Sequence, residues 1–539
     1  MKLQLSALQE REFWDGAGIA LPGYDVEKVY QRTKEEPVWV HFGIGNIFRS
    51  FLGRIADQML AEGKTDRGLT CVETFDYDVV DQIYDPCENL GISVILNPDG
   101  TRDTQVLGCF AEALRADWRK KAAWSRLKEI FRSASLQMVS LTITEKGYAL
   151  QDAEGHYFPS VLRDLENGPE QAGHAMTILT AMLLERYEHG GAAPIALVSM
   201  DNCSQNGKRL RDSILAVAQE WESRALVPAD FVRWVSDEDK AAFPWTMIDK
   251  ITPRPSLSIA EELSEKGLED MQPVMTDKKT FIAPFVNAER PQYLVVEDHF
   301  PNGRPPLETG GVYLTDRETV NKAERMKVTA CLNPIHTALC TYDCMLGYEL
   351  FADGMSDPEL KKLAHRIGYD EGLPVVPDPG ILSPKAFLDE VIRERFPNPY
   401  LDDTSQRIAT DISQMVGIRF GETIKAYVKR DGSACALKGI ALAIAGWLRY
   451  LLALDDEGRP MELAPDPMIP QLQRMLSGIK FGAPEEAVRA GALKEILSNE
   501  RIFGVNLYEA GIGSIIEAMF CEETAGPGAV RQTLRKYLS

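Results

Sequence analysis

Five short apolar runs in the first 200 residues have the length and composition of buried β-strands. They cover residues 37–43, 68–73, 92–96, 137–144 and 194–199. The runs lack a regular polar alternation, which is typical of parallel strands covered on both faces. Helical periodicity follows them, for example from Ile47 to Leu60 and, after residue 96, through about Ser133. This alternation predicts an α/β fold with a doubly wound parallel sheet of the Rossmann type.

The pattern of the chain changes after residue 300. Residues 300–306 are rich in Pro and Gly, a composition typical of linkers. From Arg317 to Ser539 nearly all the periodicity is helical. A chain of 539 residues also exceeds the size of one hydrophobic core. We therefore expect a Rossmann-type dinucleotide-binding domain over residues 1–300 and a mostly helical domain over residues 301–539.

A long apolar segment in the second domain stands out because it contains Glu, Lys, Asn and His side chains. From Glu324 to Leu346 the apolar pattern has hardly a turn signal, which predicts a buried helix. Lys327, Asn333 and His336 lie in it together with Glu324. Burying an unpaired charge costs on the order of several kcal/mol. These groups therefore form either a satisfied core network or the lining of a water-filled site.

The spacing of these side chains predicts an irregular helix. Glu324 and Lys327 are three residues apart, as are Asn333 and His336, so each pair shares a helix face. Lys327 and His336 are nine residues apart, which places them about 180° from each other on a regular helix. Pro334 disfavours regularity, and a one-residue π-bulge would bring the two within about 80°. We predict a kink or bulge between Lys327 and Pro334.

A glycine turn follows the first predicted strand. Gly43, Gly45 and Asn46 separate this strand from a helix, as in nucleotide-binding βαβ units whose backbone amides hold a diphosphate. Phe48 occupies the position of the third glycine, so the fingerprint is incomplete. We expect these four residues and Arg49 to line a cofactor site.

Acidic residues follow the second predicted strand. Glu73 ends it about 30 residues after the first glycine, and Asp76 stands just beyond. A carboxylate there accepts hydrogen bonds from ribose hydroxyls and repels a 2′-phosphate, which favours NAD over NADP. A solvated strand end is the alternative.

Polar residues also follow two later strands. Thr144, Glu145 and Lys146 follow the run 137–144, and Asp201 and Asn202 follow the run 194–199. Ligands of open α/β sheets bind outside the carboxyl ends of the strands. We therefore expect Thr144, Glu145 and Lys146 to contribute to the cofactor site.

The charge and the cysteine pattern restrict the partners. A net charge of -21 argues against nucleic acid or an anionic membrane. Nine cysteines and seven histidines are dispersed without ligand spacing, which predicts neither a disulfide framework nor a metal site. The N-terminus turns polar too early for a signal peptide. We expect a cytoplasmic monomer or small homo-oligomer that acts on a small molecule.

Six segments occur in the order of a known family. They are GIGNIFR (43–49), SLTITEKGY (140–148), DN with NG (201–207), FP with MID (243–249), ExxK with NxxH (324–336) and RFPNP with RIA (395–409). Together they resemble the polyol-specific long-chain dehydrogenases/reductases, the family of mannitol 2-dehydrogenase, fructuronate reductase and tagaturonate reductase. The resemblance implies a Rossmann-type domain, a helical domain, a site in the cleft between them and metal-independent hydride transfer with NAD(P).

The resemblance also implies roles in proton transfer. Lys327 is the expected general base that takes the hydroxyl proton, and burial favours the neutral amine that a base requires. Asn202 and Asn333 are expected to hydrogen-bond the developing alkoxide. Glu324 is expected to pass the proton between Lys327 and solvent.

The remaining roles concern the substrate, and the chain departs from the family at two positions. His336 and Asp249 are expected to orient the substrate, with Arg407 further out. Five residues separate the lysine from the asparagine where the family has four, and the predicted bulge would absorb the extra one. Many members carry a lysine eight residues after Arg407, where Met415 stands.

Cations near these motifs favour a charged substrate. Arg254, Lys250 and Arg407 offer partners for a carboxylate, although a solvated loop is the alternative for Arg254 and Lys250. We therefore expect reduction of fructuronate to D-mannonate with NADH, and the reverse with NAD. Tagaturonate reduction and mannitol oxidation are the alternatives, as is a non-catalytic nucleotide-binding protein on the same fold.

Overall fold

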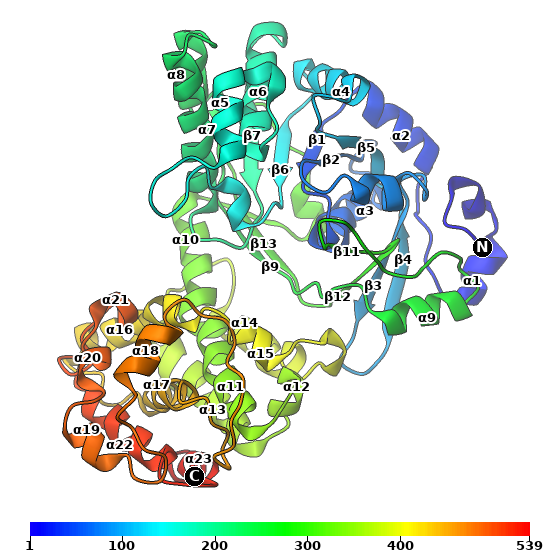
Figure 1. The fold of residues 1–539 in the computed structure, drawn as a ribbon. Helices are drawn as coiled ribbons and strands as arrows, with labels where there is room; N and C mark the ends of the chain where they lie inside the picture. The colour runs from blue at the N-terminus through cyan, green and yellow to red at the C-terminus, as the bar shows by residue number, and fades with distance from the viewer. The chain divides into compact units, whose positions relative to one another are not determined.

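The computed structural model describes residues 1–539, which fold into two compact units, Met1–Asn321 and Lys322–Ser539 (Figure 1). Residues 300–306, expected as the linker, lie inside the first unit. The chain continues from them into β14 (Tyr313–Thr315), which pairs in parallel with β13 (Tyr293–Glu297). None of the helices is both long and apolar enough to cross a membrane.

Six parallel strands form the main sheet of the first unit. Their order is β5-β2-β1-β6-β7-β8, with β2 on one side of β1 and β6 on the other. In doubly wound sheets the ligand crevice lies at such a reversal of strand order. The predicted α/β fold class with a Rossmann-type sheet is confirmed. The strands are β1 (Trp39–Phe42), β2 (Leu69–Glu73), β5 (Phe110–Arg115), β6 (Met138–Leu141), β7 (Ile195–Ser199) and β8 (Ala241–Ala242).

The segment that precedes α4 (Lys121–Arg132) differs from the expectation. The run at 92–96 is β3 (Gly91–Leu96), but it pairs with β4 (Arg102–Leu107) and β12 (Phe285–Glu289) in a separate sheet. Residues expected to be helical form β4 and β5. The turn that joins β3 to β4 contains Asp99–Gly100, whose glycine has φ +86°. An Asp-Gly pair is a strong hairpin signal, which the helical prediction overlooked.

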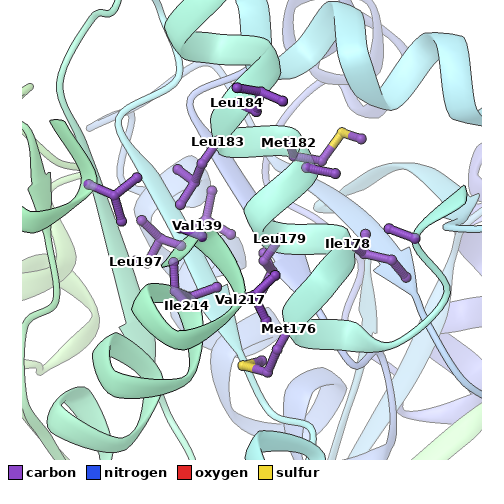
Figure 2. Close-up of a cluster of buried hydrophobic side chains, with 14 of the residues drawn as sticks. Val139, Met176, Ile178, Leu179, Met182, Leu183, Leu184, Leu197, Ile214 and Val217 are labelled. Carbon is purple, nitrogen blue, oxygen red and sulfur yellow. The ribbon is translucent and has the colours of Figure 1, made fainter. Parts of the chain in front are cut away.

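Helices cover both faces of the main sheet because side chains alternate along its strands. Val40 and Phe42 of β1 belong to one apolar cluster, whereas Trp39 belongs to the other. Figure 2 shows the first cluster, where Leu179 of one helix lies beside Val217 of the next. The helices of this unit, besides α4, are α1 (Arg11–Ala17), α2 (Val26–Glu35), α3 (Gly53–Ala61), α5 (Pro159–Asn167), α6 (Ala175–His189), α7 (Asn206–Ser223), α8 (Ala229–Ser236) and α9 (Leu257–Glu265).

Two smaller sheets complete the first unit. β9 (Thr246–Asp249) pairs antiparallel with β13, in the order β14-β13-β9. β10 (Val274–Met275) and β11 (Phe281–Ile282) form a two-stranded hairpin. Helix α10 (Arg317–Met326) then leads into the second unit.

All regular elements of the second unit are helices, as expected. Two of them, α11 (Asn333–Leu346) and α17 (Lys438–Tyr450), approach closely, because a Cβ at Gly446 would collide with the Tyr342 ring. The Tyr342 hydroxyl lies 2.7 Å from the Leu442 carbonyl oxygen. The other helices are α12 (Phe351–Gly354), α13 (Pro358–His365), α14 (Pro384–Glu390), α15 (Ser405–Ile408), α16 (Glu422–Asp431), α18 (Ile469–Met475), α19 (Glu485–Arg489), α20 (Lys494–Leu497), α21 (Glu500–Phe503), α22 (Gly513–Glu523) and α23 (Ala529–Leu538).

Candidate active site

The glycine turn after β1 lies at the reversal of strand order. Thr142, just after β6, donates its backbone N–H to the Phe42 carbonyl at 2.9 Å, so the ends of β1 and β6 are adjacent. Gly43 has φ +87°, and a Cβ there would collide with the Thr142 carbonyl oxygen. A Cβ at Gly45 would meet nothing within 4 Å, and a helix begins at Asn46. Open space beside the first N–H groups of a helix suits a diphosphate.

Phe48 and Arg49 support this turn from inside the core. The Phe48 ring is fully buried and stacks on the His41 ring, with centroids 4.1 Å apart. Arg49 is also buried and donates to the Ala283 carbonyl oxygen at 2.7 Å and to the Asn46 side-chain oxygen at 3.0 Å. Both side chains therefore face the core and support the glycine turn. The contact of these two residues with a cofactor stays a prediction.

Glu73 joins the end of β2 to the glycine turn. One oxygen of its carboxylate accepts the backbone N–H groups of residues 74–76, at 2.9–3.3 Å, and the other accepts the N–H of Ile44 at 3.3 Å. Burial raises the pKa of this carboxyl group. Asp76 is buried as well and accepts the hydroxyl of Thr276 at 2.7 Å. The loop that would meet a ribose is thus ordered.

Asp201 ties together the loops after β6 and β7. Its carboxylate accepts the backbone N–H groups of Ile143 and Thr144, both at 2.9 Å, and the Tyr148 hydroxyl at 2.6 Å. Thr144 has φ +64°, a conformation that residues with a Cβ rarely adopt. Surrounding contacts maintain such strain mainly at functional loops.

The predicted polar residues of the first unit lie in the loops after β6 and β7 and at the end of β9, which Asn206 joins to the loop after β7. Residues 144–146 and Asn202 are exposed after β6 and β7, at the edge of the sheet that carries Gly43. The Asn206 side chain donates to the backbone of the loop after β7 at 3.0 Å and to that of β9 at 3.1 Å. Asp249 ends β9 and is 7% exposed.

The two cations expected near Asp249 are held differently. Lys250 donates to the Glu289 carbonyl oxygen at 2.6 Å and to the Gln292 amide oxygen at 3.1 Å. Two of the three donors of its ammonium group are thus used within the first unit. The contact of Lys250 with a substrate carboxylate stays a prediction. Arg254 is exposed, and its guanidinium lies 5.1 Å from the centre of the Phe281 ring.

In the second unit the chain forms the predicted bulge. Lys327–Cys331 is a π-helical turn in which the Leu332 N–H donates to the carbonyl oxygen of Lys327 at 3.1 Å. Leu332 departs from helical geometry, with φ −136° and ψ −68°. Helix α11 then starts at Asn333, with Pro334 in the first turn, where a missing N–H leaves no hydrogen bond unmade. The prediction of an irregular helix between Lys327 and Pro334 is confirmed.

The predicted catalytic side chains flank this π-helical turn. Lys327 is 1% exposed and Glu324, one turn earlier, is 9% exposed. Asn333 and His336 are half-buried on the first turn of α11. On an ideal helix, the extra residue of a π-helical turn brings Lys327 to within about 80° of His336. Each side chain therefore has the burial and the helical position that a shared site requires.

His336 lies among aromatic rings and arginines. Its ring stacks on Phe396, with centroids 4.8 Å apart, and meets the edge of Phe351 at 4.6 Å. Burial lowers the pKa of His336 well below its usual value, and the charges of three arginines lower it further. These are, in order of effect, Arg419, Arg395 and Arg407. His336 is accordingly a neutral imidazole at neutral pH.

Two of these arginines have no role assigned from the sequence: Arg395, which begins one of the six family segments, and Arg419. Arg407, the expected one, is exposed and pairs with Asp403 four residues earlier. Arg395 is buried at 2% exposure, and Arg419 is half-buried. The signal available for Arg419 was its position one helical turn after Met415, where the expected lysine is missing.

Family models match both units. The model of the mannitol dehydrogenase Rossmann domain matches residues 38–309, and that of the mannitol dehydrogenase C-terminal domain matches residues 319–518. The chain belongs to the mannitol dehydrogenase family. The resemblance inferred from the six segments is thus confirmed. As a member of this family, the protein is an oxidoreductase that acts on CH–OH groups.

Two curated relatives in this family span most of the chain. One, named D-mannonate oxidoreductase, from Thermotoga maritima, is 51% identical over 539 residues, which cover 99% of each chain. Another, named polyol:NADP oxidoreductase, from Gluconobacter oxydans, is 29% identical over 86% of this chain and 88% of its own.

Solved structures share the fold. D-sorbitol dehydrogenase matches with a TM-score of 0.77 and 24% identity, over 97% of this chain and 98% of its own. Pseudomonas fluorescens mannitol 2-dehydrogenase, solved with NAD and D-mannitol, matches with a TM-score of 0.72 and 24% identity, over 100% of this chain and 99% of its own. At these identities the likeness concerns the fold alone.

Proposed function

We propose that this enzyme interconverts D-mannonate and fructuronate with NAD. The observation that carries the proposal is the 51% identity, over 99% of both chains, to a relative named D-mannonate oxidoreductase. Removing a hydride and a proton from a secondary alcohol yields the ketone. The buried Lys327 and the ordered glycine turn are the groups that such a reaction needs.

The first unit has features that fit a dinucleotide. The open space at Gly45 and the helix start at Asn46 suit the diphosphate, and the exposed residues 144–146 border the same edge of the sheet. Glu73 suits ribose hydroxyls and disfavours a 2′-phosphate. Bound NADH supplies the hydride for reduction, and NAD accepts it in oxidation. A higher kcat/KM for NADH than for NADPH is expected, and the opposite order would contradict this assignment.

We assign proton transfer to Lys327. Its neutral amine takes the hydroxyl proton in oxidation, and its ammonium returns a proton to the carbonyl oxygen in reduction. Asn202 and Asn333 donate hydrogen bonds to the developing alkoxide. Glu324, one helical turn before Lys327, passes the proton to and from solvent.

The remaining residues orient the substrate. Neutral His336, fixed between two aromatic rings, is suited to hydrogen-bonding a sugar hydroxyl. Asp249 accepts a hydrogen bond from another hydroxyl. Arg254 and Arg407 are both exposed and contact the substrate at its outer end.

The test is NADH oxidation, followed by its near-ultraviolet absorbance, with fructuronate, tagaturonate and fructose in parallel. We expect the highest kcat/KM with fructuronate among these three substrates. A preference for tagaturonate would make the protein a tagaturonate reductase, and activity on fructose alone would make it a mannitol 2-dehydrogenase. Binding of NADH without turnover of any substrate would contradict catalysis.

A further inference from the structure

Arg419 is an arginine of the second unit that has no acidic partner. It lies in the π-helical turn Gly417–Gly421, and one Nη atom donates to the hydroxyl of Thr337, the residue after His336. Building on the proposed function, we propose that Arg419 binds the substrate carboxylate and selects sugar acids over uncharged polyols. It would act as a specificity-determining residue beside His336.

The surroundings of Arg419 lack a compensating charge. Its guanidinium is half-buried, its hydrogen bond goes to Thr337, and no Asp or Glu lies within ion-pair distance. Neighbouring arginines behave differently, because Arg407 pairs with Asp403 and Arg325 with Glu422. Withdrawing a cation from water without a counter-charge is unfavourable, and a bound anion would remove that penalty.

The chemistry of the free donors indicates which anion would bind. Burial lowers the pKa of Arg419 to about 10, so it stays protonated at neutral pH. The guanidinium carries five N–H donors in a planar fork, and Thr337 uses one Nη atom. The remaining donors match the two oxygens of a carboxylate, whereas a polyol hydroxyl offers no charge to pair with.

Close packing holds Arg419 in place before any ligand arrives. A Cβ at Gly421 would collide with the Phe503 carbonyl oxygen, and one at Gly417 would lie 2.8 Å from that of Ile502, so the turn packs directly on α21. The hydroxyl of Thr423, which follows this turn, donates to the Thr329 carbonyl oxygen at 3.0 Å. Thr329 belongs to the π-helical turn that starts at Lys327. The turns that carry Arg419 and Lys327 are thus fixed to each other, which reduces the ordering cost of binding.

The experiment compares two substrates that differ in the carboxylate. Oxidation of D-mannonate and of D-mannitol with NAD is measured for the wild type, Arg419→Gln, Arg419→Lys and Arg430→Gln. Arg430 is a matched control, because it is an exposed arginine of the same unit that pairs with Asp431. In Arg419→Gln, kcat/KM for D-mannonate is expected to fall on the order of 100-fold, the loss typical of a removed charge partner. The value for D-mannitol should change by less than about threefold.

The conservative variant and a binding measurement complete the test. Arg419→Lys keeps the charge and is expected to retain part of the preference for D-mannonate. Arg430→Gln is expected to retain the whole preference. Calorimetric titration of both sugars into the NADH-loaded protein, in which neither alcohol can be oxidised, reports the preference for binding independently of turnover. A failure of the proposed function is therefore distinguishable from a failure of this inference.

Three outcomes overturn the role of Arg419. The first is an unchanged preference for D-mannonate in Arg419→Gln. The second is an equal loss on both sugars, which would indicate a structural role only. The third is a wild-type protein that binds D-mannonate no better than D-mannitol. If Arg419→Gln does not fold, the preference of Arg419→Lys relative to the wild type decides between these outcomes.

Discussion

The backbone N–H of Leu332 donates to the carbonyl oxygen of Lys327, 3.1 Å away, and closes a π-helical turn directly before Asn333. This hydrogen bond accommodates one residue more than a regular helical turn would hold. On an otherwise regular helix, one extra residue brings Lys327 to within about 80° of His336. The catalytic assignment therefore depends on the turn as much as on the lysine.

Deleting Val328 from this turn should abolish the alignment. Loss of one residue rotates Lys327 by about 100° relative to α11. We expect kcat to fall at least about 1000-fold, an effect typical of a lost and misplaced acid/base group. The matched control is Val328→Ala, which keeps the length of the turn. Steady-state kinetics and thermal melting of both variants check this, and near-control activity in the folded deletion variant would contradict it.

Glu324→Gln tests the route of the proton. An amide cannot carry a proton between Lys327 and solvent, so we expect kcat to fall roughly tenfold and its pH dependence to change shape. Glu318→Gln, at an exposed position of the same helix, is the control. The pH profile of kcat is measured from pH 5 to 10. A Glu324→Gln profile that superimposes on the wild type would rule out the relay.

His336 should remain neutral throughout the working pH range. Burial, followed by Arg419, Arg395 and Arg407, lowers its pKa well below 6.5, so it stays unprotonated as the pH falls through that value. In ¹⁵N-histidine NMR spectra we expect no titration of His336 near pH 6.5. In Arg419→Gln the pKa of His336 should rise, because Arg419 has the largest effect of the three arginines on that pKa. A wild-type midpoint close to 6.5 would show that the imidazole is solvated.

Glu523 should make stability depend on pH. It is fully buried beside the Tyr342 hydroxyl, at 2.6 Å, and burial raises its pKa to about 8 from 4.5. Between pH 4.5 and about pH 8, the Glu523 carboxyl group is ionised in the unfolded chain but protonated in the folded protein. Its contribution to stability is therefore complete below pH 4.5 and lost as the pH rises to 8, at up to about 1.4 kcal/mol per pH unit.

The variant Glu523→Gln isolates this contribution. An amide cannot ionise, so the free energy of unfolding of the variant, relative to the wild type, should increase by a few kcal/mol from pH 5 to pH 8. Glu522→Gln is the control, because Glu522 lies near the surface and pairs with Lys536. Urea unfolding at both pH values measures the difference. A difference that does not vary with pH would mean that Glu523 is already ionised in the folded state.

The sequence predicted the main sheet where its strands are buried on both faces. β1, β2, β6 and β7 are continuous apolar runs, and such runs have few alternatives to a parallel sheet. The prediction missed β4, because this strand carries the polar residues Arg102, Asp103 and Gln105 and is only partly buried. Its strand conformation comes from pairing with β3, which local periodicity does not report.

Part of the candidate site could also be predicted from the sequence. Lys327, Asn333 and His336 stand out because polar residues in an apolar helical pattern, next to Pro334, require an explanation. Arg419 did not stand out, because its contact with Thr337 spans 82 residues and exists only in the folded chain. Phe48 shows the converse, since its motif position indicated a ligand while its ring fills the core.

In the proposed mechanism, Lys327 transfers the proton during hexuronate reduction. The most direct measurement is NADH oxidation with fructuronate by the wild type and by Lys327→Ala, with NADH affinity measured in both. We predict that kcat/KM falls by about three orders of magnitude or more, while the Kd for NADH changes less than about threefold. Full activity in Lys327→Ala would show that Lys327 is not the proton donor and that another residue is the general acid.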